Sequence, residues 1–101
     1  MTKADLVEQV AEAIGPGVTK KDCALVVDGF LNAVKRAVSN GDHVELRGFG
    51  TFKVLKRKPR VARNPRTGDR VEVPARVVPF FKPSRHLSAR VARTVKLESV
   101  D

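Results

Sequence analysis

Hydrophobic residues recur at helical spacing in a first short segment of the chain. This segment opens with Thr2-Lys3-Ala4-Asp5 and stops at Gly15-Pro16-Gly17. A threonine N-cap with an acidic residue three positions later forms a capping box, and glycine favours the C-terminal end of a helix. The sequence therefore predicts an amphipathic helix that ends at Gly15-Pro16-Gly17, with an apolar face made of Leu6, Val10, Ala13 and Ile14.

A second, longer segment opens in the same way at Thr19-Lys20-Lys21-Asp22 and predicts a helix to about Ser39, with Gly41 as its stop. Its hydrophobic residues span a wide arc, because Val26, Phe30, Ala33 and Ala37 flank a regular stripe. Such a helix must be covered on more than one side, by the first helix and by a sheet or a second subunit. Cys23 is the only cysteine, which excludes an intrachain disulfide, and we interpret it as a small buried hydrophobe.

After residue 42 the pattern changes to the alternation typical of strands. A short strand over residues 43–47, with Val44 and Leu46 inward, leads to a turn at Gly48-Phe49-Gly50 and to a second strand from Thr51. A returning strand reaches Phe81, and Ser84 is expected to cap a last helix from residue 85 to about residue 96, with Leu87 and Val91 inward. A tail over about 97–101 is expected to fray. The phenylalanines expected to form core and dimer contacts are Phe30, Phe49, Phe52 and Phe81.

The segment between the second strand and its return carries the strongest charge. From Lys53 to Arg66 there are seven basic residues and no acidic one. Asn64-Pro65 and Thr67-Gly68 predict a chain reversal. About 11 residues of strand span roughly 35 Å, whereas the radius of gyration of a compact chain of this length is only ~13 Å. We therefore expect a hairpin arm over about residues 55–76 that stands away from the body. Three prolines, Pro59, Pro74 and Pro79, suit a ribbon in which every strand is an edge.

The charge is concentrated in the second half of the chain. The net charge of the 101 residues is +9, and residues 51–101 contain fourteen basic and four acidic residues. This asymmetry favours a polyanionic partner, nucleic acid first and an acidic membrane or glycan surface second. No apolar run approaches the ~20 residues of a membrane span, and the N-terminus lacks a signal sequence, so we expect a cytoplasmic protein. The length predicts one domain over residues 1–101, small enough to favour an oligomer.

Catalytic and metal-binding arrangements do not emerge from the residue types. His43 and His86 lie in different predicted elements without a cysteine or second histidine at ligand spacing, so we expect no enzyme, no metal and no cofactor. An RNA-binding protein remains an alternative, because a basic hairpin serves that role equally well. Readers of single-stranded RNA usually display aromatic stacking platforms, and this chain has no Trp or Tyr.

Three motifs together identify a resemblance that runs from Met1 to about Ala92. Gly48-Phe49-Gly50-Thr51-Phe52, the stretch from Arg63 to Gly68, and Phe81-Lys82-Pro83 resemble the bacterial HU and integration host factor family of nucleoid DNA-binding proteins. The resemblance implies an α+β fold: two N-terminal helices, a three-stranded antiparallel β-sheet with a protruding β-hairpin arm, and a C-terminal helix. It also implies an intertwined dimer whose arms embrace double-stranded DNA through the minor groove, as is known of these proteins.

The resemblance also implies roles for individual residues. Pro65 matches the proline that wedges between base pairs and kinks the duplex, with Arg63, Asn64 and Arg66 beside it at the minor groove; the alternative is that Pro65 only shapes a turn. Arg57, Lys58, Arg60 and Arg76 would line the arm, and Lys82, Arg85 and Arg90 would face DNA from the body. The full set expected to bind DNA is Lys53, Lys56, Arg57, Lys58, Arg60, Arg63, Asn64, Arg66, Arg70, Arg76, Lys82 and Arg85.

The chain also departs from the family pattern at several positions. Ala62 stands where glycine is common, Ser84 replaces a glycine after Lys82-Pro83, and Pro59 and Phe80 are unexpected. The resemblance implies a nucleoid protein that bends, wraps and compacts DNA with weak sequence preference. It leaves open a sequence-preferring subunit like integration host factor, and a heterodimer in place of a homodimer. Neither a membrane nor a small-molecule substrate is expected.

Overall fold

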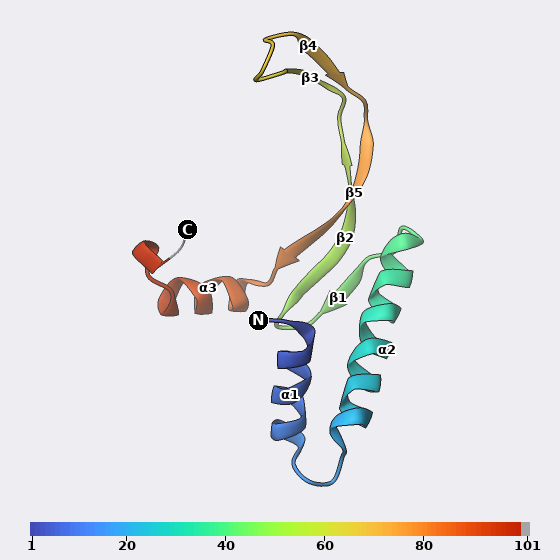
Figure 1. Ribbon diagram of the computed structural model, residues 1–101, viewed down its shortest axis with the longest axis vertical. Helices are drawn as coiled ribbons and strands as arrows, with labels where there is room; N and C mark the ends of the chain where they lie inside the picture. Colours follow the sequence, from blue (N-terminus) through green and yellow to red (C-terminus); the bar gives the residue numbers. More distant parts are fainter. Residues whose placement is uncertain (100–101) are drawn as a thin grey trace. The chain divides into compact units, whose positions relative to one another are not determined.

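The computed structural model describes residues 1–99, and the chain divides into two compact units. The first unit is Met1–Arg36, and the second begins at Ala37. In chain order the elements are α1 (Lys3–Ile14), α2 (Lys20–Ser39), β1 (Val44–Leu46), β2 (Gly50–Arg57), β3 (Arg60–Arg63), β4 (Arg70–Val73), β5 (Arg76–Pro83), α3 (Arg85–Thr94) and the 3₁₀ turn η1 (Leu97–Ser99) (Figure 1).

Both N-terminal helices begin at the predicted caps. The Thr2 hydroxyl accepts the Asp5 N–H, and the Asp5 carboxylate accepts the Thr2 N–H at 2.8 Å, which completes the capping box. Thr19 accepts the Asp22 N–H at 3.1 Å in the same way. Gly15 ends α1 with a positive φ of 90°, a conformation that glycine adopts without steric cost. The predicted starts of both helices and the end of the first are confirmed.

The helical unit buries few of its hydrophobic side chains. Val7 and Cys23 are buried, as expected for Cys23, and two exposed ion pairs, Lys3–Asp28 at 2.7 Å and Lys20–Glu8 at 3.6 Å, join α1 to α2. Exposed ion pairs of this kind contribute little stability. The wide apolar arc of α2 is largely uncovered, with Val26 69% and Phe30 50% exposed.

The second unit is organised around an antiparallel sheet in the order β1-β2-β5. β1 pairs only with the first three residues of β2, so that β2 and β5 continue beyond Phe52 as a two-stranded ribbon. β3 and β4 form a separate two-stranded sheet at the distal end of this ribbon (Figure 1). Val44 and Leu46 are half-buried and Glu45 is exposed, which confirms the predicted alternation. The predicted sheet and hairpin arm are confirmed.

Three phenylalanines pack together at the base of the ribbon. The ring centroid of Phe81 lies 4.8 Å from that of Phe52 and 5.3 Å from that of Phe49, and the rings are tilted, a favourable geometry for aromatic pairs. Gly50 is buried against them: a Cβ there would lie 2.6 Å from the Phe81 ring and from the Lys82 carbonyl oxygen. The close packing therefore requires glycine at this position. Phe30, expected in the same set, belongs to the helical unit.

The C-terminal helix α3 begins at the predicted cap. The Ser84 hydroxyl accepts the Leu87 N–H at 3.0 Å, and the Ser84 N–H donates to the Phe49 carbonyl at 2.9 Å. Ser84, which stands where the family commonly has glycine, thus caps α3 with its hydroxyl. Its backbone N–H ties the start of α3 to the turn before β2. Leu87 is half-buried, but Val91, expected inward, is 48% exposed on the single chain. α3 ends at Thr94, two residues before the predicted end. Of the tail expected to fray, residues 97–99 form η1, and residues 100–101 lie outside the described residues.

Candidate nucleic-acid interface

The strand register sorts the basic side chains of the ribbon onto its two faces. Side chains alternate along a strand, and residues directly opposite each other share a face. Phe52 and Phe81 are such a pair and mark one face. Four basic residues lie on the opposite face of β2 and β5, which we call the cationic face: Lys53, Arg57, Arg76 and Lys82. Lys56 lies on the phenylalanine face. Beyond Arg57, Arg60 lines one hollow together with Arg57 and Arg76. The structure therefore groups a third of the predicted DNA-binding set on one surface of β2 and β5.

Two pairs of arginines on the ribbon stand directly across from each other. Arg57 pairs with Arg76 at the end of β2 and β5, and Arg63 pairs with Arg70 at the end of β3 and β4. All four side chains are exposed, and like charges directly opposite are destabilising. Within residues 1–99, the ion pairs found both join α1 to α2, so neither arginine pair is matched by an ion pair there. The arrangement favours an external anion that lies along the ribbon.

Nearer the base, Lys53 and Lys82 extend the cationic face. The Lys53 Nζ lies 5.9 Å from the centroid of the Phe80 ring, within reach of a cation–π interaction. Lys82, Arg85 and Arg47 line one hollow of about 320 Å³ beside the β1–β2 turn, together with Glu45. Arg47 was not among the residues predicted to bind DNA, and its signal in the sequence is only its place directly before Gly48-Phe49-Gly50.

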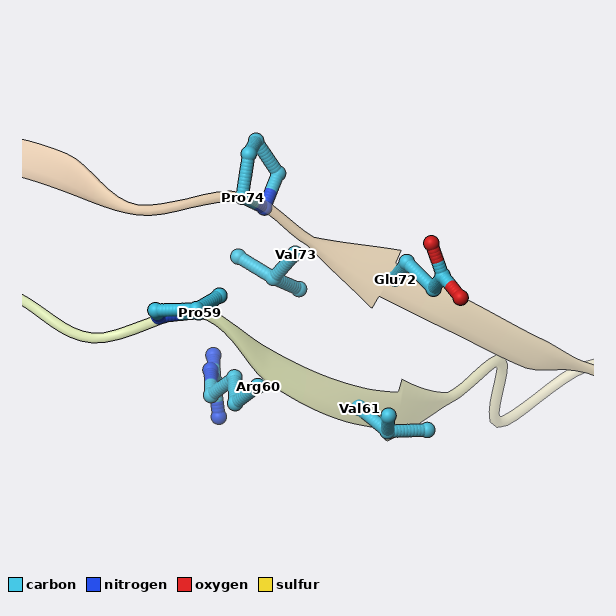
Figure 2. A pocket seen from close by; sticks show the side chains of 6 residues that line it. All are labelled: Pro59, Arg60, Val61, Glu72, Val73 and Pro74. Atoms are coloured by element: carbon cyan, nitrogen blue, oxygen red, sulfur yellow. The ribbon is translucent and has the colours of Figure 1, made fainter.

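Two prolines divide the ribbon into a proximal and a distal part. Pairing stops after Arg57 and Arg76 and resumes at Arg60 and Val73, so each strand has two residues in the gap. The register is the same on both sides, which places Pro59 opposite Pro74. Neither residue has an N–H to donate, so the ladder cannot close between them. We call this gap the proline break. It lies beside an open hollow of about 400 Å³ lined by Pro59, Arg60, Val61, Glu72, Val73 and Pro74 (Figure 2).

The distal turn, residues 64–69, is closed by hydrogen bonds within its own sequence. The Asn64 N–H donates to the Asp69 carbonyl at 2.8 Å, and the Gly68 N–H donates to the Asn64 carbonyl at 2.7 Å. The Asn64 Oδ1 accepts the Arg66 N–H at 2.9 Å, and Arg63 Nη1 donates to the Gly68 carbonyl at 3.1 Å. Gly68 adopts a positive φ of 77°. Pro65 is exposed on this turn.

The predicted DNA-binding residues therefore fall on connected parts of one unit. Lys53, Lys56 and Arg57 lie in β2, Lys58 in the proline break, Arg60 and Arg63 in β3, Arg70 in β4, Arg76 and Lys82 in β5, and Arg85 opens α3; Asn64, Pro65 and Arg66 form the turn. All are exposed except Lys53 and Asn64, which are half-buried. Asn64 is half-buried because its side chain is folded back onto the turn.

Ala62, where the family commonly has glycine, lies within β3 opposite Val71. No residue other than glycine among the described residues has a positive φ, so alanine fits this strand without strain.

Other kinds of site are not found in the part of the chain that the structure describes. Residues 1–99 contain no group of three His, Cys, Asp or Glu side chains placed to hold a metal ion. None of the helices described is both long and apolar enough to cross a membrane.

Comparison with known proteins gives consistent results. Residues 1–92 match the model of a family described as bacterial DNA-binding protein. DNA-binding protein HU of Thermus thermophilus is 46% identical over 93 residues, which cover 92% of this chain and 94% of that protein. Integration host factor subunit beta of Cupriavidus metallidurans is 45% identical over 95 residues, or 94% of this chain and 70% of that protein.

Solved structures match in the same way. The structure of Anabaena HU in a cocrystal with DNA has a TM-score of 0.82 and 42% identity, and it covers 91% of this chain and 98% of that one. HU from Thermotoga maritima has a TM-score of 0.62 and 30% identity, and it covers 90% of this chain and 98% of that one.

Proposed function

Since the chain belongs to the bacterial DNA-binding protein family that includes HU and integration host factor, we propose that it is an architectural protein that bends double-stranded DNA. In this proposal it binds the minor groove with weak sequence preference, and it wraps and compacts the nucleoid DNA. The observation that carries it is the basic ribbon, where two arginine pairs stand opposite each other and form no ion pair within residues 1–99. A DNA backbone along the ribbon would offset their mutual repulsion.

In the proposed mechanism, charge supplies affinity and the exposed Pro65 supplies the kink. The cationic face neutralises phosphates and releases their counterions, which gives attraction without sequence information. A rigid apolar ring between two base pairs replaces part of the stacking that the kink removes. Base edges in the minor groove are nearly degenerate, so this mode of contact favours weak sequence preference.

We further propose that two copies of the chain form the binding unit and that both units of each copy fold as one domain in the dimer. Val7 and Cys23 are the hydrophobic residues buried among those described, whereas Leu25, Val26 and Phe30 on α2 are each at least half exposed. A chain of this size needs more buried apolar surface to be stable. Sedimentation equilibrium should give twice the mass of the chain, and a monomer at micromolar concentration would refute this part. A mass of two unlike chains in material from the native host would indicate a heterodimer.

Energy transfer between dyes at the ends of a short duplex tests the bending directly. The protein should bring the dyes together, and Pro65→Ala should reduce the bend more than the affinity, because the wedge is lost while the charge remains. Pro16→Ala in the loop between α1 and α2 is the matched control and should bend DNA like the wild type. An unchanged bend in Pro65→Ala would leave Pro65 with only the role of shaping a turn.

Two further comparisons separate this function from its alternatives. Bending a 20–30 bp site costs on the order of several kcal/mol, so nicked DNA should bind tighter than an intact duplex. Double-stranded DNA should also displace RNA in direct competition, and the reverse order would favour an RNA-binding protein. Both HU and integration host factor are among the relatives. Footprinting with random competitor DNA distinguishes them: diffuse protection supports weak preference, and a competitor-resistant site supports a sequence-preferring protein.

A further inference from the structure

Asn64 directly precedes Pro65 and forms hydrogen bonds within the turn through both its backbone and its side chain. Its backbone N–H and carbonyl and its side-chain Oδ1 each have a partner within the turn: Asp69 at 2.8 Å, Gly68 at 2.7 Å and Arg66 at 2.9 Å. Pro65 and Arg66 are exposed, whereas Asn64 is half-buried. The carboxamide therefore spans Pro65, with its acceptor on the residue that follows the proline.

This arrangement is an Asx turn, in which an asparagine oxygen accepts the N–H two residues later. Pro65 contributes no N–H, so the turn cannot use a backbone donor at that position. The bond from Arg66 to Oδ1 is consequently the contact that fixes the backbone directly after the proline. Without this hydrogen bond, the orientation of the rigid Pro65 ring relative to β3 and β4 would be less restricted.

The chemistry of the minor groove also separates the two ends of the carboxamide. A·T pairs present only acceptors there, and G·C pairs add one donor. An acceptor such as Oδ1 has little to bind in an A·T-rich groove, so its engagement within the turn costs the protein no base contact. Only the Nδ2 group is suited to donate to base edges.

We propose that Asn64 is a positioning residue, whose Oδ1 holds the turn so that Pro65 is presented to DNA in one orientation. This inference rests on the proposed function, because it assigns Asn64 a part in the bending attributed to Pro65. It predicts that the oxygen at position 64, and not the amide nitrogen, determines the bend.

Four variants separate positioning from direct contact. Asn64→Ser retains a short-chain acceptor that forms the same type of turn more weakly, but it has no amide. Asn64→Gln retains the amide but sets its oxygen one carbon too far for this turn. Asn64→Asp keeps the acceptor and removes the donor, and Asn64→Ala removes both. None of these changes touches a buried side chain, and thermal unfolding checks that each variant keeps the fold.

The first measurement is the ratio of bent to unbent complexes, by energy transfer on an end-labelled duplex at saturating protein. One lost hydrogen bond corresponds to roughly a 2- to 12-fold shift in an equilibrium, so Asn64→Ala and Asn64→Gln should lower the ratio by that factor. Asn64→Ser should lie closer to the wild type. Asn64→Asp should bend whatever DNA it binds, although its added charge weakens binding. If Asn64→Gln bends DNA like the wild type while Asn64→Ser does not, a contact role is correct and the proposal is wrong.

The second measurement uses the free protein, so that it does not depend on DNA. The temperature coefficient of the Arg66 amide proton reports whether that N–H is hydrogen-bonded; it should become that of an exposed amide in Asn64→Ala and Asn64→Gln, and stay low in Asn64→Ser. An unchanged coefficient in Asn64→Ala would overturn the proposal. If the wild-type protein does not bend DNA, the proposed function fails, and this measurement still decides whether Asn64 holds the turn.

Discussion

The two ends of the ribbon are ordered by different forces. At the base, Phe49, Phe52 and Phe81 pack against one another and enclose Gly50. At the distal turn, residues 64–69 have no buried side chain, and hydrogen bonds between near neighbours hold the backbone. The residues that stabilise the ribbon and those proposed to contact DNA therefore lie at opposite ends of it. Changes at the base should affect folding, and changes toward the turn should affect binding.

The largest expected effect is the removal of the central ring at the base. Phe81→Ala should lower the free energy of unfolding by about 3 kcal/mol, because the ring is lost from contact with both other phenylalanines and a cavity remains. Phe80→Ala is the control: this neighbour lies on the other face, 37% exposed, and should cost much less. Urea unfolding at a fixed protein concentration measures both. Equal losses of unfolding free energy would show that the contacts among the three phenylalanine rings are not the main source of stability at the base of the ribbon.

A smaller loss is expected from an added methyl group at Gly50. Gly50→Ala should destabilise the protein by about 2 kcal/mol, since the Cβ would overlap the Phe81 ring and a backbone carbonyl that cannot move freely. Gly48→Ala is the control, because its Cβ would meet nothing within 4 Å and only its positive φ is unfavourable. Thermal unfolding compares the two. A Gly48 variant as unstable as the Gly50 variant would mean that conformation, and not packing, requires glycine in this turn.

At the middle of the ribbon the effect on stability should change sign. Arg57→Gln should raise the free energy of unfolding by a few tenths of a kcal/mol, because it relieves the repulsion with Arg76. It should also lower the slope of log affinity against log salt by about 0.9 if one phosphate contact is lost. Lys56→Gln, the next residue on the opposite face, should leave the slope nearly unchanged. Equal slopes for both variants would refute the division into two faces.

The smallest effect on global stability is expected at the proline break. Pro59→Val with Pro74→Val restores two N–H donors and should let the ladder close, with little change in the unfolding midpoint. The motion of β3 and β4 should decrease, visible as higher ¹⁵N order parameters for residues 60–73. Pro79→Val is the control, because Pro79 already lies in a continuous ladder opposite Val54. Unchanged order parameters would show that Pro59 and Pro74 do not determine the motion of β3 and β4.

Much of the fold follows from short-range signals in the sequence. Thr2, Thr19 and Ser84 cap their helices as predicted, because a cap depends only on the next three residues. The ribbon was also predicted, since its charge leaves no face to bury. The proline break was not, because opposition of Pro59 and Pro74 depends on the register. That register follows from the closing pair of the turn, Asn64 and Asp69, which the sequence does not specify.

The candidate site was predicted as a set of residues but not as a surface. Arg57 and Lys56 are adjacent in sequence and equal in charge, and only the pairing with β5 assigns them to opposite faces. The engagement of Asn64 was also missed, although Asn-Pro is a known signal for the start of a turn. Phe30 shows a different limit, since periodicity identifies an apolar face without saying what covers it.

The unbroken register across the proline break limits how such an arm can change length. Two residues are skipped on each strand, so the break interrupts hydrogen bonding but the strands resume pairing in the same register. Insertion of one residue in β3 alone would turn every later side chain of that strand to the opposite face. Insertions and deletions should therefore be tolerated only when both strands change together, by the same number of residues, and arm length in evolution should vary in such steps.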